Sequence, residues 1–135
     1  MDDINGRLLK NAITATPDGG LEERIDRFLD LRIPLLEKLV AYRRSAAAME
    51  PLPQSVHARR RAVRLQLRNE VAIMFAPELR AAGKGRGKLL LNAIAVTTES
   101  ECWDNLRRNY GTSAANSRST IRLMLTRMLG LSNRI

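Results

Sequence analysis

The sequence has 135 residues, the length of a single domain, and its 44% hydrophobic and 27% charged residues are those of a soluble globular protein. Only 4% of the residues are aromatic, so the expected core is aliphatic, which favours helices over sheets. A single cysteine excludes an internal disulfide and suits the cytoplasm. The charged N-terminal segment is unlike a signal peptide, and the longest apolar run is too short to cross a membrane.

The net charge of +9, from 23 basic and 14 acidic residues, is the least ordinary property of the composition. Such a balance attracts nucleic acids and other acidic surfaces, although it carries no information about fold. An arginine-rich solvated surface without any partner explains the same number. Both interpretations stay open at this point.

Two helical segments are expected in the first third of the chain. Apolar residues at helical spacing predict a helix over Asp2 to Ala15, and Thr16 to Gly20 then forms a turn. A second helix is predicted to begin at Leu21, with acidic residues in its first turn. Pro34 lies inside this second pattern and predicts a kink or a break near Leu31 to Ile33, because proline lacks the N–H donor and clashes one turn back.

A long helix is predicted over Val56 to Phe75, with Ser55 as its N-cap, and it should bend or end at Pro77. The following segment, Ala82 to Lys88, reads as a flexible basic loop. Its glycines are one residue too close for a phosphate-binding P-loop, and no Ser or Thr follows the lysine. A helix–helix connection is therefore the better interpretation of this segment.

The last part of the chain is predicted to form two helices joined by a short hinge. The first helix covers Lys88 to Tyr110 and contains the only tryptophan, Trp103. Gly111 stops it, Ser113 starts the next one, and an apolar stripe then continues over Ala114 to Leu129. No alternating pattern is long enough for a sheet, so the predicted fold class is an all-α helical bundle that forms one domain over residues 1–135.

No catalytic or metal-binding constellation emerges from the sequence. His57 is the only histidine and has no partner at ligand spacing, and Cys102 beside the tryptophan is expected to be a buried apolar group. The carboxylates of Glu99 and Glu101 are the more open case, since Glu99 could face a cavity. We expect no enzyme, no cofactor and no metal.

Arginines form a stripe along one flank of the long central helix. Arg60, Arg64 and Arg68 recur every four residues, and the segment from Asn105 to Ile135 has six arginines and no acid. Together they could contact phosphates. No interleaved aromatic residues support base stacking, and no helix-turn-helix pattern is present.

Several segments of the chain resemble one known family. They are Asp2–Ala15, Leu21–Ile25, Phe75–Leu79, Trp103–Arg107, Gly111–Ser113 and a last helix with Ile121, Leu125 and Leu129. In this order they resemble the C-terminal regulatory domain of the tetracycline-repressor (TetR) family of bacterial transcription regulators, including its W-x-x-L-R…G-x-S hinge. The resemblance covers nearly the whole chain.

The resemblance implies a helical bundle that pairs two copies through its last two helices and surrounds a pocket for a small-molecule effector. In the family, effector binding changes the spacing of two DNA-binding heads. The three-helix head would precede the connecting helix, and this sequence begins at that helix. The chain is therefore expected to be a fragment, a mis-started product or a headless relative.

Two sets of residues follow from this expectation. The predicted dimer interface consists of small residues on the penultimate helix and an apolar stripe on the last one: Ala93, Thr97, Ile121, Met124, Leu125 and Met128. The predicted pocket is lined by apolar residues and one threonine: Phe28, Leu67, Val71, Met74, Ile94, Thr98 and Trp103. Both sets could instead belong to the core of a monomer.

The sequence thus predicts the effector-binding and dimerisation domain of a TetR-like regulator, cytoplasmic and non-enzymatic, in which a ligand selects between two dimer geometries. The alternative is a headless helical adaptor that binds nucleic acid through Arg60, Arg64 and Arg68 or forms a heterodimer with a complete regulator. The effector and the operator stay unidentified.

Overall fold

The computed structural model describes residues 18–47 and 53–132. Within these ranges the chain forms six α-helices and one π-helical turn, and no strand is present. The all-α prediction is therefore confirmed, whereas the helix predicted over residues 2–15 lies outside the described residues. The elements are α2 (Leu21–Ala47), α3 (Gln54–Met74), α4 (Ala76–Ala82), α5 (Lys84–Thr97), α6 (Ser100–Asp104), the π-helical turn (Asn105–Asn109) and α7 (Ala114–Ser132).

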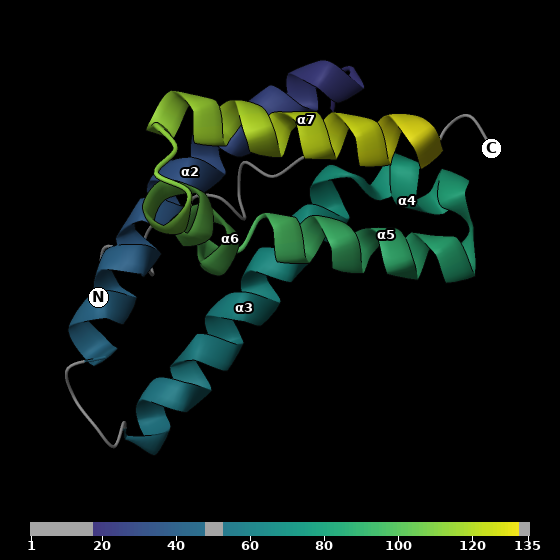
Figure 1. Ribbon diagram of the computed structural model, residues 1–135. Helices are drawn as coiled ribbons and strands as arrows, with labels where there is room; N and C mark the ends of the chain where they lie inside the picture. The colour runs from purple at the N-terminus through teal and green to yellow at the C-terminus, as the bar shows by residue number, and fades with distance from the viewer. Residues whose placement is uncertain (1–17, 48–52, 133–135) are drawn as a thin grey trace.

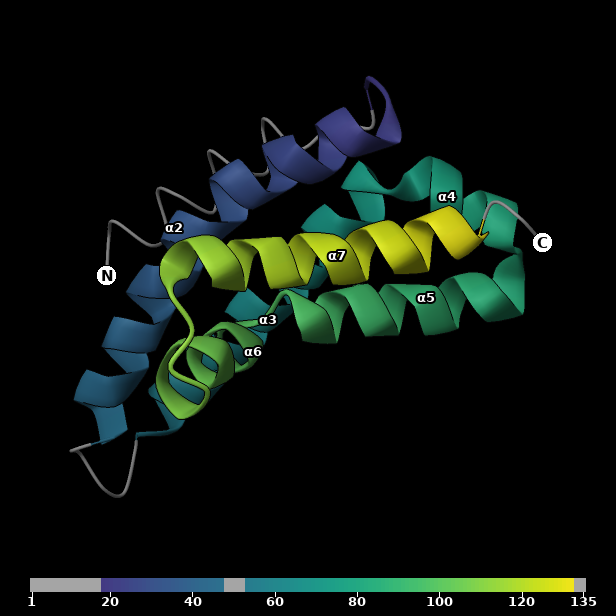
Figure 2. The same cartoon turned by 45° about the horizontal axis from the view of Figure 1, so that its top comes forward.

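Helix α2 begins where predicted and continues through its proline. Gly19 has a positive φ of 89° and directs the chain into the helix, whose first turn holds Glu22 and Glu23 at the positive end of the helix dipole. Helix α2 continues as one helix through Pro34, so a break is excluded. Figure 2 shows the axis of α2 bending about midway along its length, as expected of an internal proline.

Helix α3 starts two residues earlier than expected and without the predicted cap. Pro53 occupies the N-cap position, no side chain caps the helix, and Ser55 lies within its first turn. The prediction of Ser55 as N-cap is therefore wrong. The proline supplies the extended backbone that precedes a helix, with ψ at 149°, and makes an earlier start possible. At the other end Phe75 turns the chain, and Pro77 lies in the first turn of α4, as its fixed φ favours.

The predicted flexible loop over residues 82–88 is wrong. Only Gly83 leaves the helical conformation, with a φ of 89°, and α5 begins at Lys84. Gly87 lies buried within α5, so close to α4 that a Cβ atom there would be 2.6 Å from the backbone oxygen of Leu79. Close packing of α4 on α5 thus outweighs the poor helix propensity of the two glycines in α5, Gly85 and Gly87.

The single helix predicted over Lys88 to Tyr110 is also wrong, because it is divided after Thr97. The hydroxyl of Thr98 donates to the carbonyl oxygen of Ile94 at 2.8 Å, and the chain turns there into the short helix α6. The hinge that follows is confirmed. Gly111 has a φ of 64°, and the hydroxyl of Ser113 accepts a hydrogen bond of 3.1 Å from the backbone N–H of Asn116, which caps α7.

The helices pack around one main core, in which α5 and α7 lie side by side (Figure 1). Trp103 of α6 is 1% exposed and belongs to this core. A second, smaller cluster lies between α2 and α3 and consists of Leu35 and Leu67, with Leu39, Tyr42 and Val63 packed against it and partly exposed. None of the described helices is both long and apolar enough to span a membrane.

Two buried ion pairs connect α2 to the helices after it. The guanidinium of Arg24 donates to both carboxylate oxygens of Glu78 on α4, at 2.6 and 2.7 Å. Arg32 pairs with Glu70 of α3 at 3.2 Å and donates to Thr98 at the end of α5. All four charged side chains are at most 7% exposed. Buried pairs of this kind favour one relative position of the helices, because any other leaves a charge without a partner.

Asp26 connects α2 to α7. Its carboxylate accepts hydrogen bonds from Arg122 at 2.8 and 3.2 Å, and the bond from Arg122 is the largest cause of the lowered pKa of Asp26. A carboxyl group whose pKa is lowered by folding stabilises the fold above its unfolded-state pKa and loses this contribution as the pH falls through the folded-state value.

We expect Asp26→Asn to lower the free energy of unfolding near neutral pH by less than about 1 kcal/mol, since solvent screens this half-exposed pair. The difference from the unmodified protein should shrink as the pH falls below about 4. Urea unfolding of both proteins at neutral and at acidic pH checks this expectation. An equal difference at both pH values would contradict it.

Candidate functional site

A cleft between α2, α3 and α6 is the candidate site. Its volume is about 90 Å³. The lining side chains are apolar on the floor and charged around the rim: Leu39, Tyr42, Arg43, Arg59, Arg60, Val63, Arg64, Leu67, Glu99, Ser100 and Glu101. Residues from three elements that are distant in the sequence thus meet in one concave place.

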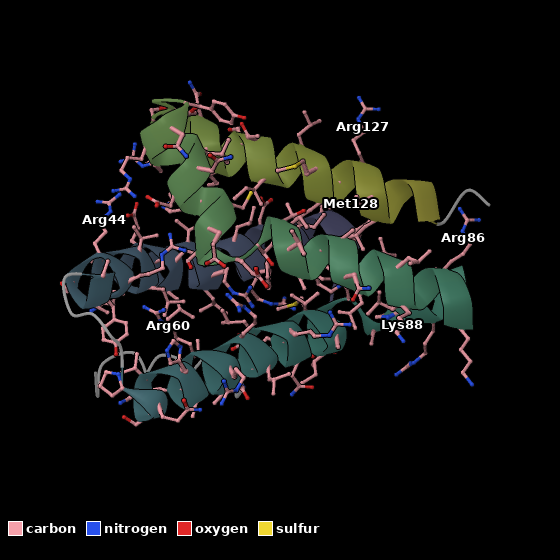
Figure 3. All side chains as sticks on the ribbon, turned by 60° about the horizontal axis from the view of Figure 1, so that its bottom comes forward. Arg44, Arg60, Arg86, Lys88, Arg127 and Met128 are labelled. Atoms are coloured by element: carbon pink, nitrogen blue, oxygen red, sulfur yellow. The ribbon has the colours of Figure 1, made fainter. Side chains whose placement is uncertain are left out.

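The floor of the cleft is the open side of the smaller hydrophobic cluster. Leu67 is buried, whereas Leu39, Tyr42 and Val63 pack against it and stay partly exposed. These side chains come from the second half of α2 and the first half of α3, beyond the main core. Figure 3 shows Arg60 between the ribbons of α2 and α3. The apolar surface is therefore incompletely covered, as in ligand sites and unlike in a closed core.

Ion pairs organise one side of the rim. Glu101 lies 2.9 Å from both Arg43 of α2 and Arg64 of α3, and the same Arg64 lies 3.6 Å from Glu99. Asp104, at the end of α6, also accepts hydrogen bonds from Arg43 at 3.1 Å and from Arg44 at 2.8 Å. These bridges attach α6 to both walls of the cleft, although solvent weakens each of them.

The two glutamates at the rim differ in their acidity. Burial raises the pKa of Glu99, and the charge of Arg64 offsets this only in part. Burial acts in the same direction on Glu101, but the hydrogen bond from Ser100 and the charges of Arg43 and Arg64 outweigh it and lower the pKa of Glu101. The cleft therefore carries one carboxylate that is firmly held in its ionised form and one that protonates more readily.

The predicted pocket residues lie deeper than this cleft. Leu67 lines it, whereas the other six are at most 4% exposed and fill the interior: Phe28, Val71, Met74, Ile94, Thr98 and Trp103. Thr98 accepts a hydrogen bond of 3.2 Å from Arg32, and the ring of Phe28 lies 4.6 Å from the same guanidinium. The structure brings these residues together as core around a buried charge.

The predicted interface residues divide into two groups. Ile121 and Leu125 are fully buried against the main core, so their assignment to an interface is wrong. The helical period places them on the inner side of α7, where helix α2 and the main core cover them. The other four are half-buried and stay available at the surface: Ala93, Thr97, Met124 and Met128.

The predicted arginine stripe is only partly free. Arg64 pairs with Glu99 and Glu101, whereas the structure shows no ion pair of Arg60 or Arg68 with any described residue. Arg60 borders the cleft.

Cys102 is half-buried, and burial raises the pKa of its thiol, which lowers the fraction of reactive thiolate. Among the described residues no group of three potential metal ligands occurs.

Several residues that line the cleft were not predicted from the sequence as part of a site. Leu39, Tyr42 and Val63 were absent from every predicted site. A signal was nevertheless available: Arg59 and Val63 are four residues apart, and Leu67 follows after another four, so charge and apolar surface share one side of α3. Helix α6 lies beside this side of α3 because the predicted helix over Lys88 to Tyr110 is divided after Thr97. The sequence pattern did not reveal that division.

Comparisons with protein-family models, with curated proteins and with solved structures find no match to this chain.

Proposed function

We propose that the chain is the dimerising and effector-binding domain of a TetR-like transcription regulator. The observation that carries the proposal is the pair of helices α5 and α7, which lie side by side (Figures 1 and 2). Both helices expose large apolar side chains. The order of helices and the Gly111–Ser113 hinge agree with the resemblance of the sequence to this family.

Apolar side chains are exposed on α5 at helical spacing and on α7 at one large residue. On α5, Leu89 is 69% and Val96 is 64% exposed, and Ala93 lies between them at helical spacing. On α7, Leu123 is 56% exposed, and its neighbour in the sequence, Met124, is half-buried. Two copies that join these surfaces would form a four-helix interface with two-fold symmetry, which removes the apolar surface from water.

Introducing a charge at an exposed apolar residue of α7 tests the dimer. We expect the unmodified protein to be a dimer at micromolar concentration and Leu123→Arg to shift it to a monomer, because the arginine would be buried without a partner. Light scattering behind a sizing column measures the mass. Leu65→Arg is the matched control, since Leu65 on α3 is also exposed, at 67%, and lies outside α5 and α7. If the unmodified protein is a monomer at this concentration, the proposed dimer is wrong.

The cleft between α2, α3 and α6 is the place at which an effector would act. Glu101 and Asp104 of α6 connect to α2 and α3, and α6 leads through the hinge at Gly111 into α7. A ligand that changes the separation of the two walls would therefore move α6 relative to the dimer helices. Such a ligand regulates only if it binds the two dimer geometries with different affinity.

Nucleic-acid binding through the arginine stripe is the weaker alternative. Of its three members, Arg64 is already engaged by two carboxylates, and Arg60 borders a concave surface. Backbone recognition by phosphate contacts requires cations that are free to approach a strand. The stripe therefore offers fewer contacts than its spacing in the sequence indicates.

A further inference from the structure

The chemistry of the cleft between α2, α3 and α6 points to a particular class of ligand. Its floor is apolar, with Leu39 contributed by α2 and with Val63 and Leu67 contributed by α3. Apolar surface of this kind gains free energy when a hydrocarbon group covers it. The apolar part of a ligand would thus rest on the floor.

The rim carries more positive than negative charge. Four arginines and two glutamates line the cleft. Both glutamates are engaged by Arg43 or Arg64, so they offer little to a cation. Arg59 and Arg60 have no ion pair with any described residue and stay partly exposed at the edge of the apolar floor. A bound anion would accept hydrogen bonds from these two guanidinium groups.

The size of the cleft limits the ligand. A volume of about 90 Å³ has room for roughly six to nine water molecules, at about 10–15 Å³ for each. A carboxylate with a chain of about six carbons has a similar number of non-hydrogen atoms. A nucleic-acid strand, by contrast, needs a longer groove that follows several phosphates and stacking aromatic residues.

We propose that the cleft binds a small amphipathic anion, with its hydrocarbon part on Leu39, Val63 and Leu67 and its carboxylate-like head at Arg59 and Arg60. The inference rests on the proposed effector-binding function and names the class of effector. Tyr42 lines the cleft and packs against the cluster at its floor, and its apolar ring with a polar hydroxyl suits the boundary between the two parts of such a ligand.

Three probes of equal chain length test the inference: hexanoate, 1-hexanol and hexylammonium. Each is titrated into the ¹⁵N-labelled protein, and amide chemical shifts report where it binds. We expect hexanoate to shift resonances around the cleft and to bind at least about fivefold more tightly than the other two, which corresponds to about 1 kcal/mol for a partly exposed ion pair.

Variants of the rim identify the head-group site. Arg60→Gln and Arg59→Gln should each weaken hexanoate binding about fivefold and leave 1-hexanol binding unchanged, whereas Arg60→Lys should retain most of the preference. Arg86→Gln is the control, because Arg86 lies at the opposite end of the molecule from Arg60 (Figure 3). Circular dichroism verifies that every variant is folded.

The outcomes separate this inference from the proposed function. Equal binding of hexanoate and 1-hexanol at the cleft, or tighter binding of hexylammonium, overturns the anionic class and leaves an effector site in place. No shift at the cleft with any probe overturns both the ligand class and the effector site. A monomer that still binds hexanoate at Arg59 and Arg60 supports this inference and overturns the proposed dimeric regulator.

Discussion

Replacement of Arg32 by methionine is expected to lower the free energy of unfolding by about 3–5 kcal/mol, the usual effect of breaking a buried ion pair by removal of one partner. Arg32 is 2% exposed and joins three helices. Its guanidinium donates to the carbonyl oxygens of Thr98 and Leu67 at 3.1 and 3.0 Å, and to a carboxylate oxygen of Glu70 at 3.2 Å. The methionine cannot replace any of these bonds.

The reason for so large an effect is the charge that would be left behind. Burial is the main cause of the raised pKa of Glu70, and Arg32 opposes that shift. Burial lowers the pKa of Arg32 to about 10, which still leaves the guanidinium charged at neutral pH. Without Arg32, Glu70 must either stay ionised in an apolar interior or take up a proton, and both cost free energy.

Urea unfolding of the two proteins measures the difference. Arg64→Met is the control, because Arg64 also pairs with glutamates but its side chain is 58% exposed, so its loss should cost no more than about 1 kcal/mol. The double variant Arg32→Met/Glu70→Met should recover much of the stability, since removing both charges leaves no buried charge uncompensated. Equal losses for Arg32→Met and Arg64→Met would show that the buried pair does not stabilise the fold.

Periodicity and helix-stop residues predicted the all-α class and several of the helix boundaries correctly. The start of α2 at Leu21, the bend at Pro34 and the turn at Pro77 all follow from one local rule each, and the structure contains them. The hinge at Gly111 and Ser113 was equally predictable, because positive φ and hydroxyl capping are properties of single residues. Local chemistry determines these features, so the sequence reveals them.

The charged interior could not be predicted in the same way. No place in the fold was predicted for Arg24 or Arg32, and arginine is seldom buried. Both nevertheless fall on the apolar side of α2, and Arg32 is four residues from Phe28 and from Leu36. That pattern was a signal for burial, but the acid partners Glu70 and Glu78 lie on other helices, and periodicity does not say which helices meet.

The same limit explains the interpretation of α7. Ile121 and Leu125 were grouped with Met124 and Met128 because all four lie on one broad side of the helix. Within such a side the inner residues belong to the core, and those at its edge remain for a partner. The boundary between them depends on how α7 is rotated against α2 and α5, which is a property of the packed molecule.

Substitutions of two neighbouring glycines should have opposite effects on stability. Gly85→Ala is expected to raise the free energy of unfolding by up to about 1 kcal/mol, because alanine favours the helix and nothing lies within 4 Å of the added Cβ atom. Gly87→Ala is expected to lower it by about 2 kcal/mol. There the Cβ atom would be 2.6 Å from the backbone oxygen of Leu79, which has no rotamer to change, so α4 and α5 must move apart.

Thermal and urea unfolding of both variants measure the two signs. Each protein is the other's control, since both substitutions add one methyl group to the first turns of α5. In a flexible connection, as the glycines alone would indicate, both substitutions should change stability by less than about 0.5 kcal/mol. Opposite signs instead require that residues 84–88 are helical and that Gly87 faces α4, because only contact between the two helices distinguishes Gly87 from Gly85.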